Sequence, residues 1–278
     1  MKVLVTGAAG MLGQDLVPLL RERGHDVVPV DIEVDITDPV AIGMRMAAER
    51  PDAIFHLAAW TNVDGAEENE DAAYAVNADG TRNVAAAAAA IGAAVVCVST
   101  DYVFAGTQDD GYAEDDPVGP VGVYGRTKEA GEAAARDVHP EGVRIARTAW
   151  LYGAGGPNFV DTMRRLGRER DEVTVVADQV GSPTWTRDLA PALIDLLDRP
   201  PGIYHTAGGG RVTWADFARE IYARDGIDCA VRDVTTAEFG RPAPRPAVSI
   251  LRVTKEDSPR LRDWREALAD YLAENPAS

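Results

Sequence analysis

Short apolar runs alternate with helical patterns through the first half of the chain, and this alternation restricts the fold more than any other feature. Predicted strands cover residues 2–6, 26–30, 53–58 and 94–100, and predicted helices cover residues 11–23, 38–49 and 70–91 between them. The strand segments are rich in β-branched residues and continuously apolar, which is typical of parallel strands buried on both faces. The sequence therefore predicts βαβ units and an α/β fold with a doubly wound parallel sheet of the Rossmann type.

The predicted division of the chain lies near residue 150. A helix at about 125–136 and a strand at 142–148 continue the alternation, which loosens after Tyr152. We expect residues 1–150 to form a dinucleotide-binding domain and residues 151–278 a smaller C-terminal substrate-binding subdomain. About residues 173–200, which contain a predicted strand at 173–178 and a predicted helix at 187–197, are expected to return to the first domain. Further helices are predicted at 158–169, 213–225 and 263–273.

Three glycines follow the first predicted strand, in the segment TGAAGMLGQDL. Gly7 permits a tight turn, Gly10 lets the backbone approach a pyrophosphate, and Gly13 lets the helix lie close to the sheet. Met11 and Leu12 begin that helix, whose free N–H groups are expected to face the cofactor. The spacing is GxxGxxG rather than GxGxxG, and an ordinary strand-to-helix turn is the alternative. The position between a strand and a helix favours dinucleotide binding.

The second predicted strand ends in Asp31, and Glu33 and Asp35 follow it. An acidic side chain here accepts hydrogen bonds from the adenosine ribose hydroxyls and repels a 2′-phosphate. This favours NADH over NADPH, although NADPH stays open. The alternative is that all three residues only cap or solvate the turn before the next helix, for which Thr37 or Asp38 suffices.

Tyr124 and Lys128 lie four residues apart in a predicted helix, so they share one face. Lys128 is one of three lysines among 28 basic residues, and all the others are arginine. A nearby ammonium favours the phenolate and lowers the pKa of a tyrosine, which is about 10 when unperturbed. A compact ammonium also suits a nicotinamide ribose better than a planar guanidinium. A solvated Tyr–Lys pair on a surface helix is the alternative.

Ser99 and Thr100 end the fourth predicted strand, at the carboxyl edge where open α/β sheets bind ligands. A hydroxyl there can hydrogen-bond both a substrate carbonyl oxygen and a tyrosine. A strand-end hydroxyl bonded to its own backbone is the alternative. Because Tyr124 and Lys128 lie downstream, we expect Thr100 to join them in the catalytic group.

Together, the glycine segment, the Ser99–Thr100 strand end and the Tyr124–Lys128 pair resemble the extended short-chain dehydrogenase/reductases. Further segments resemble one branch of them, the dTDP-4-dehydrorhamnose reductases: AAWTNVDGAE (58–67), VNADGTRNVA (76–85), STDYVFAG (99–106), RTAWLYG (147–153), NFVDTM (158–163), ADQVGSPT (177–184) and RPAPRPAVSIL (241–251). The similarity runs from residue 2 to the last predicted helix, and the set is more specific than any single motif.

The resemblance implies reduction of the C4 ketone of dTDP-4-dehydro-L-rhamnose (dTDP-6-deoxy-L-lyxo-4-hexulose) to dTDP-L-rhamnose. It implies that a nicotinamide delivers hydride, Tyr124 protonates the forming alkoxide, Lys128 binds the ribose and tunes the phenol, and Thr100 polarises the carbonyl. It also implies cofactor contacts at Asp35, Ile36, Ala58, Ala59 and Thr61, and substrate contacts at Val63, Asp101, Tyr102 and Trp150.

Two sets of residues each have two possible roles. Trp60 and Trp150 fit a core as well as a site, and we favour a site role only for Trp150, which follows a strand. Arg241 and Arg245 in the proline-rich tail could clamp the substrate diphosphate or bridge to the acidic surface.

Other enzymes of the superfamily fit less well. A 4,6-dehydratase typically has glutamate after Thr-Asp, whereas this chain has Tyr102 after Asp101, so a plain reductase is favoured. Segments 177–184 and 241–251 favour the reductase over a 4-epimerase. A non-catalytic NAD(P)-binding regulatory subunit of the same branch is disfavoured by the presence of Thr100, Tyr124 and Lys128. A different nucleotide-linked keto-sugar substrate stays open.

Composition restricts the possible ligands and the cellular location. The net charge of −17 argues against nucleic acid, because docking on phosphates requires a basic face. Cys97 and Cys229 form no CxxC pair and the four histidines show no metal-ligand spacing, so neither disulfides nor a metal site is predicted. The chain begins without a signal-peptide pattern and has no apolar run long enough to span a bilayer. We expect a cytoplasmic protein, and a homodimer stays open.

Overall fold

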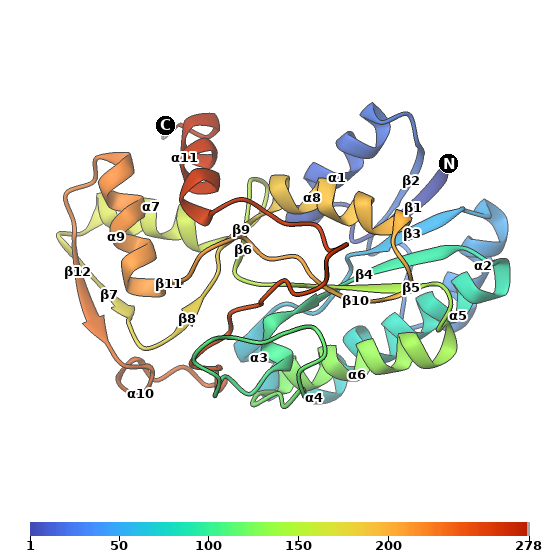
Figure 1. Cartoon of the computed structure of the whole chain (residues 1–278), viewed down its shortest axis with the longest axis horizontal. Coiled ribbons are helices and arrows are strands. Elements are labelled where there is room, and N and C mark those ends of the chain that lie inside the picture. The colour runs from blue at the N-terminus through green and yellow to red at the C-terminus, as the bar shows by residue number, and fades with distance from the viewer. Residues whose placement is uncertain (277–278) are drawn as a thin grey trace.

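The computed structural model describes residues 1–276, and a six-stranded parallel sheet forms its centre (Figure 1). Across the sheet, the strands are β10 (Gly202–His205), β5 (Val143–Thr148), β4 (Ala94–Thr100), β3 (Ala53–His56), β1 (Lys2–Thr6) and β2 (Asp26–Val30). Every neighbouring pair is parallel. The chain adds β2 on one side of β1 and β3 to β5 on the other, so the order reverses between β1 and β3. The predicted doubly wound sheet is confirmed.

Helices cover both faces of this sheet (Figure 1). On one face, α1 (Met11–Glu22) and α8 (Thr186–Asp195) pack against Val3 and Val5 of β1. On the other face, α2 (Pro39–Glu49), α5 (Thr81–Ile91) and α6 (Val123–Val138) form a second core with Leu4. Successive residues of a strand point to opposite faces, so a continuously apolar strand supplies both cores.

The helix predicted over residues 70–91 is divided by a π-helical turn. It consists of α4 (Glu70–Tyr74), the π-helical segment η1 (Ala75–Gly80) and α5. The turn lies against α6, where a Cβ at Gly131 would come within 2.2 Å of the Asn77 carbonyl oxygen. Asn77 Nδ2 donates to Thr127 Oγ1 of α6 at 2.9 Å, and Asn77 Oδ1 accepts from the Trp60 N–H at 2.8 Å. Hydrophobic periodicity did not indicate this turn, which lies in contact with another helix. A short helix, α3 (Val63–Glu68), precedes it and was not predicted.

Most residues after β5 build a smaller unit at one end of the molecule (left in Figure 1). Its core gathers the aromatic side chains of Tyr152, Trp185, Phe217, Trp264 and Tyr271. Its elements are α7 (Phe159–Glu169), α9 (Trp214–Asp225), α11 (Trp264–Glu274) and three strand pairs: β7 (Glu172–Val176) with β12 (Ala230–Val234), β6 (Leu151–Tyr152) with β9 (Thr184–Trp185), and β8 (Val180–Gly181) with β11 (Val212–Thr213). Shorter turns are η2 (Asp101–Val103), η3 (Leu196–Asp198) and α10 (Thr236–Phe239).

The segment that returns to the first domain differs from the expected 173–200. The helix α8 does return and packs beside α1. The returning strand, however, is β10, which pairs with β5, and not the segment at 173–178. The strand β7 stays in the smaller unit because β12 pairs with it along its whole length, from Glu172 to Val176.

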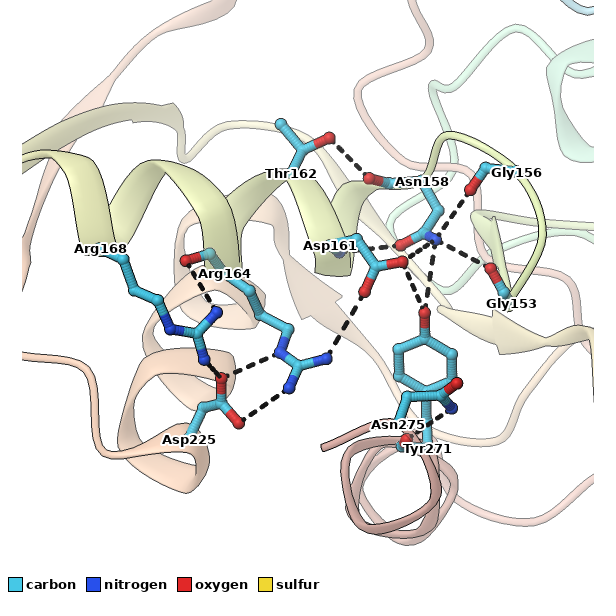
Figure 2. A network of polar contacts seen from close by, with 10 residues as sticks. All are labelled: Gly153, Gly156, Asn158, Asp161, Thr162, Arg164, Arg168, Asp225, Tyr271 and Asn275. Atoms are coloured by element: carbon cyan, nitrogen blue, oxygen red, sulfur yellow. Dashed lines mark hydrogen bonds and ion pairs between the residues drawn. The ribbon is translucent and has the colours of Figure 1, made fainter. Parts of the chain in front are cut away.

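A polar network fixes the start of α7 against the neighbouring helices (Figure 2). Asn158 Oδ1 accepts from the Asp161 N–H at 2.9 Å, and Asn158 Nδ2 donates to the Gly153 carbonyl at 2.9 Å. The Tyr271 hydroxyl of α11 donates to Asp161 Oδ2 at 2.8 Å. Ion pairs with Asp225 of α9 extend the network through Arg164 and Arg168. The loop between Gly153 and Asn158 is therefore attached to the smaller unit.

Candidate active site

A cavity of about 900 Å³ lies at the carboxyl ends of the central strands, where the sheet order reverses. It brings together most residues that the sequence indicated: Gly7, Gly10, Met11, Leu12, Gly13, Asp31, Asp35, Ile36, Ala58, Ala59, Thr61, Thr100, Asp101, Tyr124, Lys128 and Trp150 all line it. Four predicted substrate contacts lie outside this lining: Val63, Tyr102, Arg241 and Arg245. The expected cofactor positions and the expected catalytic group thus face one space.

The glycine loop has the shape that a pyrophosphate requires. Gly7 has a φ of +66°, and a Cβ there would lie 2.7 Å from the Ala58 nitrogen. A Cβ at Gly13 would lie 2.4 Å from the Ala8 carbonyl oxygen. Gly10 precedes α1 without a side-chain capping bond, so the first N–H groups of α1 are left for a ligand. A helix N-terminus of this kind favours anions, and the loop fits a dinucleotide.

The acidic residues after β2 have distinct partners. Asp31 Oδ2 accepts from the Ala9 N–H of the glycine loop at 2.8 Å, and its Oδ1 accepts from the Ile32 N–H at 3.0 Å. Asp35 Oδ1 accepts from the Thr37 N–H and hydroxyl, and these hydrogen bonds lower the pKa of Asp35. Asp38 caps α2 through the Val40 N–H. Asp35 and Asp38 therefore fill turn and cap roles, while Asp31 connects the end of β2 to the glycine loop.

Thr100, Tyr124 and Lys128 meet at the carboxyl end of β4. All three line the cavity, and Lys128 Nζ donates to the Val98 carbonyl of β4 at 2.8 Å. Lys128 is only 7% exposed. The solvated Tyr–Lys pair that the sequence left open is therefore wrong.

The predicted effect of Lys128 on the acidity of Tyr124 is also wrong for the protein without ligands. Burial raises the pKa of Tyr124 to about 12, and the charge of Asp101 acts in the same direction. The ammonium of Lys128 is bonded to a backbone carbonyl of β4 instead of the phenol. Burial in turn lowers the pKa of Lys128. The phenol is therefore protonated at neutral pH.

Ser99 belongs to a buried network that the sequence did not reveal. Its hydroxyl donates to Glu132 Oε1 at 2.5 Å, and Arg147 Nη2 of β5 donates to Glu132 Oε2 at 2.6 Å. Glu132 is one helical turn after Lys128, so Tyr124, Lys128 and Glu132 follow one face of α6. The spacing of four residues between Lys128 and Glu132 was the sequence signal that could have indicated Glu132. The network joins α6 to the ends of β4 and β5.

Asp101 is buried next to the Thr100–Tyr124 pair and is 2% exposed. Its Oδ1 accepts from the Thr100 hydroxyl at 2.9 Å, whereas its Oδ2 is buried without a hydrogen-bond partner. Burial raises the pKa of Asp101 to about 7, against the hydrogen bond from the Thr100 hydroxyl. Tyr102 lies edge-on to Tyr124 with ring centroids 5.9 Å apart.

Trp150 forms a flat wall of the cavity. Its φ is +46°, which is rare for a residue with a side chain. Its ring stacks on Trp214 of α9, with centroids 3.4 Å apart and planes 4° apart, and Gly181 leaves room beside it. The sequence did not indicate Trp214, because its place beside Trp150 depends on the fold. Trp60, in contrast, does not line the cavity, and its indole N–H donates to the Asn62 carbonyl at 3.0 Å.

The tail arginines pair with one acidic residue of α3. Asp64 Oδ2 is 3.2 Å from Arg241 Nη1, and Asp64 Oδ1 is 3.1 Å from Arg245 Nη2. Arg245 Nη1 also donates to the Ala243 carbonyl at 2.9 Å. In the protein without ligands, the two arginines therefore bridge to an acidic residue, which is one of the two roles the sequence left open.

Neither a metal-ligand cluster nor a membrane-spanning helix is found in residues 1–276. Within residues 1–276, no group of three or more His, Cys, Asp or Glu side chains could hold a metal ion. In the same part of the chain, no helix combines the length and apolar character needed to cross a membrane.

Known proteins resemble the chain over nearly its whole length. The family model described as "RmlD substrate binding domain" matches residues 1–276. A Streptomyces griseus protein named dTDP-4-dehydrorhamnose reductase is 47% identical over 278 residues, covering 96% of this chain and 91% of that protein. The chain belongs to the RmlD substrate-binding-domain family. The resemblance to dTDP-4-dehydrorhamnose reductases seen in the sequence is confirmed.

Two further relatives extend the comparison. The crystal structure of dTDP-4-dehydrorhamnose reductase from Bacillus anthracis in complex with NADP has a TM-score of 0.95 at 40% identity, covering 98% of this chain and 99% of that one. A dTDP-4-keto-6-deoxy-D-glucose reductase from Streptomyces niveus is 43% identical, covering 95% of this chain and 90% of that protein. These relatives are oxidoreductases by name, and they differ in the sugar that each is named for.

Proposed function

We propose that this chain reduces the C4 ketone of dTDP-4-dehydro-L-rhamnose to dTDP-L-rhamnose with NAD(P)H, the last step of dTDP-L-rhamnose biosynthesis. The observation that carries the proposal is the convergence of Thr100, Tyr124 and Lys128 on the cavity that the glycine loop also lines. The chain is also 47% identical, nearly end to end, to a dTDP-4-dehydrorhamnose reductase.

The side chains suit a ketone reduction. When bound, the nicotinamide supplies a hydride to the substrate carbon. Tyr124 is protonated at neutral pH because burial raises its pKa, so its O–H can pass a proton to the carbonyl oxygen. Thr100 lines the same cavity, and its hydroxyl can donate to the same carbonyl oxygen when it turns away from Asp101. The buried ammonium of Lys128 is assigned to the nicotinamide ribose.

The glycine loop is assigned to the cofactor pyrophosphate and Asp31 to the adenosine ribose. Asp31 supports a preference for NADH, because its carboxylate lies at the cavity and would repel a 2′-phosphate. The Bacillus anthracis relative was crystallised with NADP, so the two cofactors need a direct comparison.

Replacement of Asp31 tests the preference. In Asp31→Asn, the ratio of kcat/KM for NADH to that for NADPH should fall about tenfold, which corresponds to about 1.4 kcal/mol. Asp26→Asn is the matched control. Asp26 is exposed at the start of β2, the strand that Asp31 follows, and it does not line the cavity. An Asp31→Asn ratio equal to that of the control would remove Asp31 from cofactor selection.

A second substrate deserves a test because of one relative. The Streptomyces niveus protein, at 43% identity, is named for dTDP-4-keto-6-deoxy-D-glucose. Both sugars present a C4 ketone, so the same catalytic group would serve either. Dehydration is less well supported, because Tyr102 stands where a dehydratase of this superfamily typically has glutamate.

A coupled assay decides among these activities. The purified protein is mixed with NADH or NADPH and with one of the two 4-keto sugars, absorbance at the nicotinamide band is followed, and the sugar product is identified. We expect oxidation of the cofactor and formation of dTDP-L-rhamnose. Turnover of only the second sugar would transfer the proposal to that substrate. No cofactor oxidation with any pair would overturn the reductase proposal.

A further inference from the structure

A buried ion pair lies next to the elements that carry the catalytic group. Glu132 of α6 is 5% exposed and Arg147 of β5 is 2% exposed, and neither residue lines the active-site cavity. Arg147 Nη2 donates to Glu132 Oε2 at 2.6 Å, and Arg147 Nε donates to Glu132 Oε1 at 2.9 Å. A guanidinium that binds a carboxylate through two nitrogens holds it in a fixed orientation. The pair has no role in the reduction as described so far.

The Glu132 carboxylate also accepts a hydrogen bond from the end of β4. The Ser99 hydroxyl donates to Glu132 Oε1 at 2.5 Å, a length typical of a hydroxyl bonded to a charged carboxylate. Ser99 and Arg147 are register partners in the parallel pair of β4 and β5, so their side chains leave the same face of the sheet. One side chain of α6 is therefore bonded to two neighbouring strands at once.

Stability alone does not account for a buried ion pair at this place. Removing two charges from water costs about as much free energy as their attraction returns, and an apolar pair of similar volume is often equally stabilising. A buried pair can instead fix one arrangement of the elements among several similar ones.

The arrangement fixed here is the position of α6 against the end of β4. Ser99 lies between Thr100 and Val98, and the Val98 carbonyl accepts from Lys128 Nζ at 2.8 Å. Glu132 follows Lys128 by one helical turn, so two successive turns of α6 are bonded to two successive residues of β4. The proposed proton donor and ribose ligand belong to α6, whereas the hydroxyl that binds the substrate carbonyl belongs to β4. A shift of α6 along the strand would separate them.

We propose that Glu132 is a positioning residue for the reduction. Held by Arg147, its carboxylate anchors Ser99 and thereby sets the distance between Thr100 and Tyr124. A misplacement of reacting groups by about 1 Å can lower a rate about 100-fold, so the anchor acts on the chemical step. The inference rests on the proposed function, because this distance matters only if the two side chains act on one substrate.

The first test is Ser99→Ala, which removes the anchored hydroxyl and keeps the ion pair. Rapid mixing with saturating cofactor and 4-keto sugar gives a rate constant and an amplitude for the first turnover. The rate constant should fall at least about tenfold, while the amplitude stays near that of the unaltered protein. A purely structural role would lower the amplitude, because part of the sample would be unfolded, and leave the rate constant unchanged. That result would overturn the proposal.

The second test removes the carboxylate and leaves Ser99 in place. In Glu132→Met/Arg147→Met, two apolar side chains of similar length replace the pair, so the protein should keep its fold and thermal midpoint while Ser99 loses its acceptor. Because neither residue lines the active-site cavity, a direct contact with the substrate cannot explain a slower first turnover. We expect a rate constant at least about tenfold lower than that of the unaltered protein, and one within about threefold would contradict the positioning role.

Ser182→Ala is the matched control. Ser182 is 1% exposed, its hydroxyl donates to the Gly210 carbonyl at 2.7 Å, and it does not line the cavity. This variant loses a buried hydrogen bond as Ser99→Ala does, and its first-turnover rate constant should be unchanged. Equal slowing of the two variants would show that the place of the lost bond is unimportant and would overturn the proposal. If the unaltered protein reduces neither sugar, the proposed function fails. If it reduces one and the Ser99 and Glu132 variants react as fast, only the positioning role fails.

Discussion

Among single residues, Lys128 occupies a site where the size of the cation matters. It is 7% exposed, and its Nζ donates to the Val98 carbonyl at 2.8 Å, so a larger guanidinium would have to displace β4 or enter the cofactor space. We expect Lys128→Arg to lower kcat at least about tenfold, measured with saturating substrate. Lys255→Arg is the control, because Lys255 lies over the Tyr204 ring outside the active-site cavity. Equal rates for the two variants would show that charge alone suffices.

Gly13 offers a second test at this scale. A Cβ at Gly13 would lie 2.4 Å from the Ala8 carbonyl oxygen. Neither the start of α1 nor the backbone at Ala8 can move away without shifting the glycine loop. Gly13→Ala should therefore lower the thermal midpoint and weaken dinucleotide binding. Gly43→Ala is the matched control, because a Cβ at Gly43 meets nothing within 4 Å and Ala favours the helix by up to about 1 kcal/mol. A Gly13→Ala protein as stable as this control would refute the close-approach argument.

The residues that sequence reasoning found are those with a local pattern. Tyr124 and Lys128 are four residues apart, and Thr100 ends a strand, so spacing and position identified them. Glu132 and Trp214 were missed because their partners are distant in sequence: Ser99 is 33 residues from Glu132. The prediction that Lys128 lowers the pKa of Tyr124 was wrong for a related reason, since that pKa depends on burial and on which group the Lys128 ammonium contacts. Neither the burial of the phenol nor the contact of the ammonium can be read from composition or residue spacing.

At the scale of elements, five strands of the central sheet were predicted, whereas β10 and most strands of the smaller unit were not. A strand buried on both faces has a continuous apolar run, as in β4. The strand β12 is largely exposed and carries Arg232 and Asp233, so it gave no strand signal. Without β12, nothing indicated that β7 would pair outside the central sheet. The expectation that 173–178 returns to the first domain failed for this reason.

The start of α7 gives a prediction at the same scale. Asn158 caps α7 and donates to the Gly153 carbonyl (Figure 2). The loop that follows Gly153 lines the cavity at Gly155 and Gly156, and Gln14 Nε2 of α1 donates to the Gly155 carbonyl at 2.9 Å. Asn158→Ala should lower the free energy of unfolding by about 1 kcal/mol and also weaken dinucleotide binding, measured by calorimetric titration. Loss of stability without a change in binding would show that the cap does not order the loop.

The control for this prediction is another helix cap. Asp263 caps α11 by accepting from the Arg265 N–H at 2.9 Å, and it does not line the cavity. Asp263→Ala should cost a similar free energy of unfolding and leave the dinucleotide affinity unchanged. A weakened affinity in this control would mean that stability alone governs binding.

For the whole molecule, two buried groups make stability depend on pH with opposite signs. Burial lowers the pKa of His56 from 6.5 to about 3, so below pH 6.5 only the unfolded chain takes up that proton and stability falls with falling pH. Burial raises the pKa of Asp101 from 3.8 to about 7, so in that range only the folded chain holds the proton and stability falls with rising pH. Between about pH 4 and 6.5 the two effects oppose each other.

His56 can be separated from Asp101 by substitution. Its ring lies between the Thr6 and Thr81 hydroxyls at 2.8 and 3.1 Å, and glutamine keeps a donor and an acceptor there without titrating. His56→Gln should be less stable than the unaltered protein at pH 7.5, because the packing is imperfect. The difference in free energy of unfolding between the two proteins should shrink by up to about 1.4 kcal/mol per pH unit below 6.5. The reason is that only the unfolded chain with histidine then takes up a proton, which lowers the stability of the unaltered protein. Urea unfolding from pH 7.5 to 5 measures the difference, and a deficit that stays constant or grows toward pH 5 would mean that His56 is protonated in the folded protein.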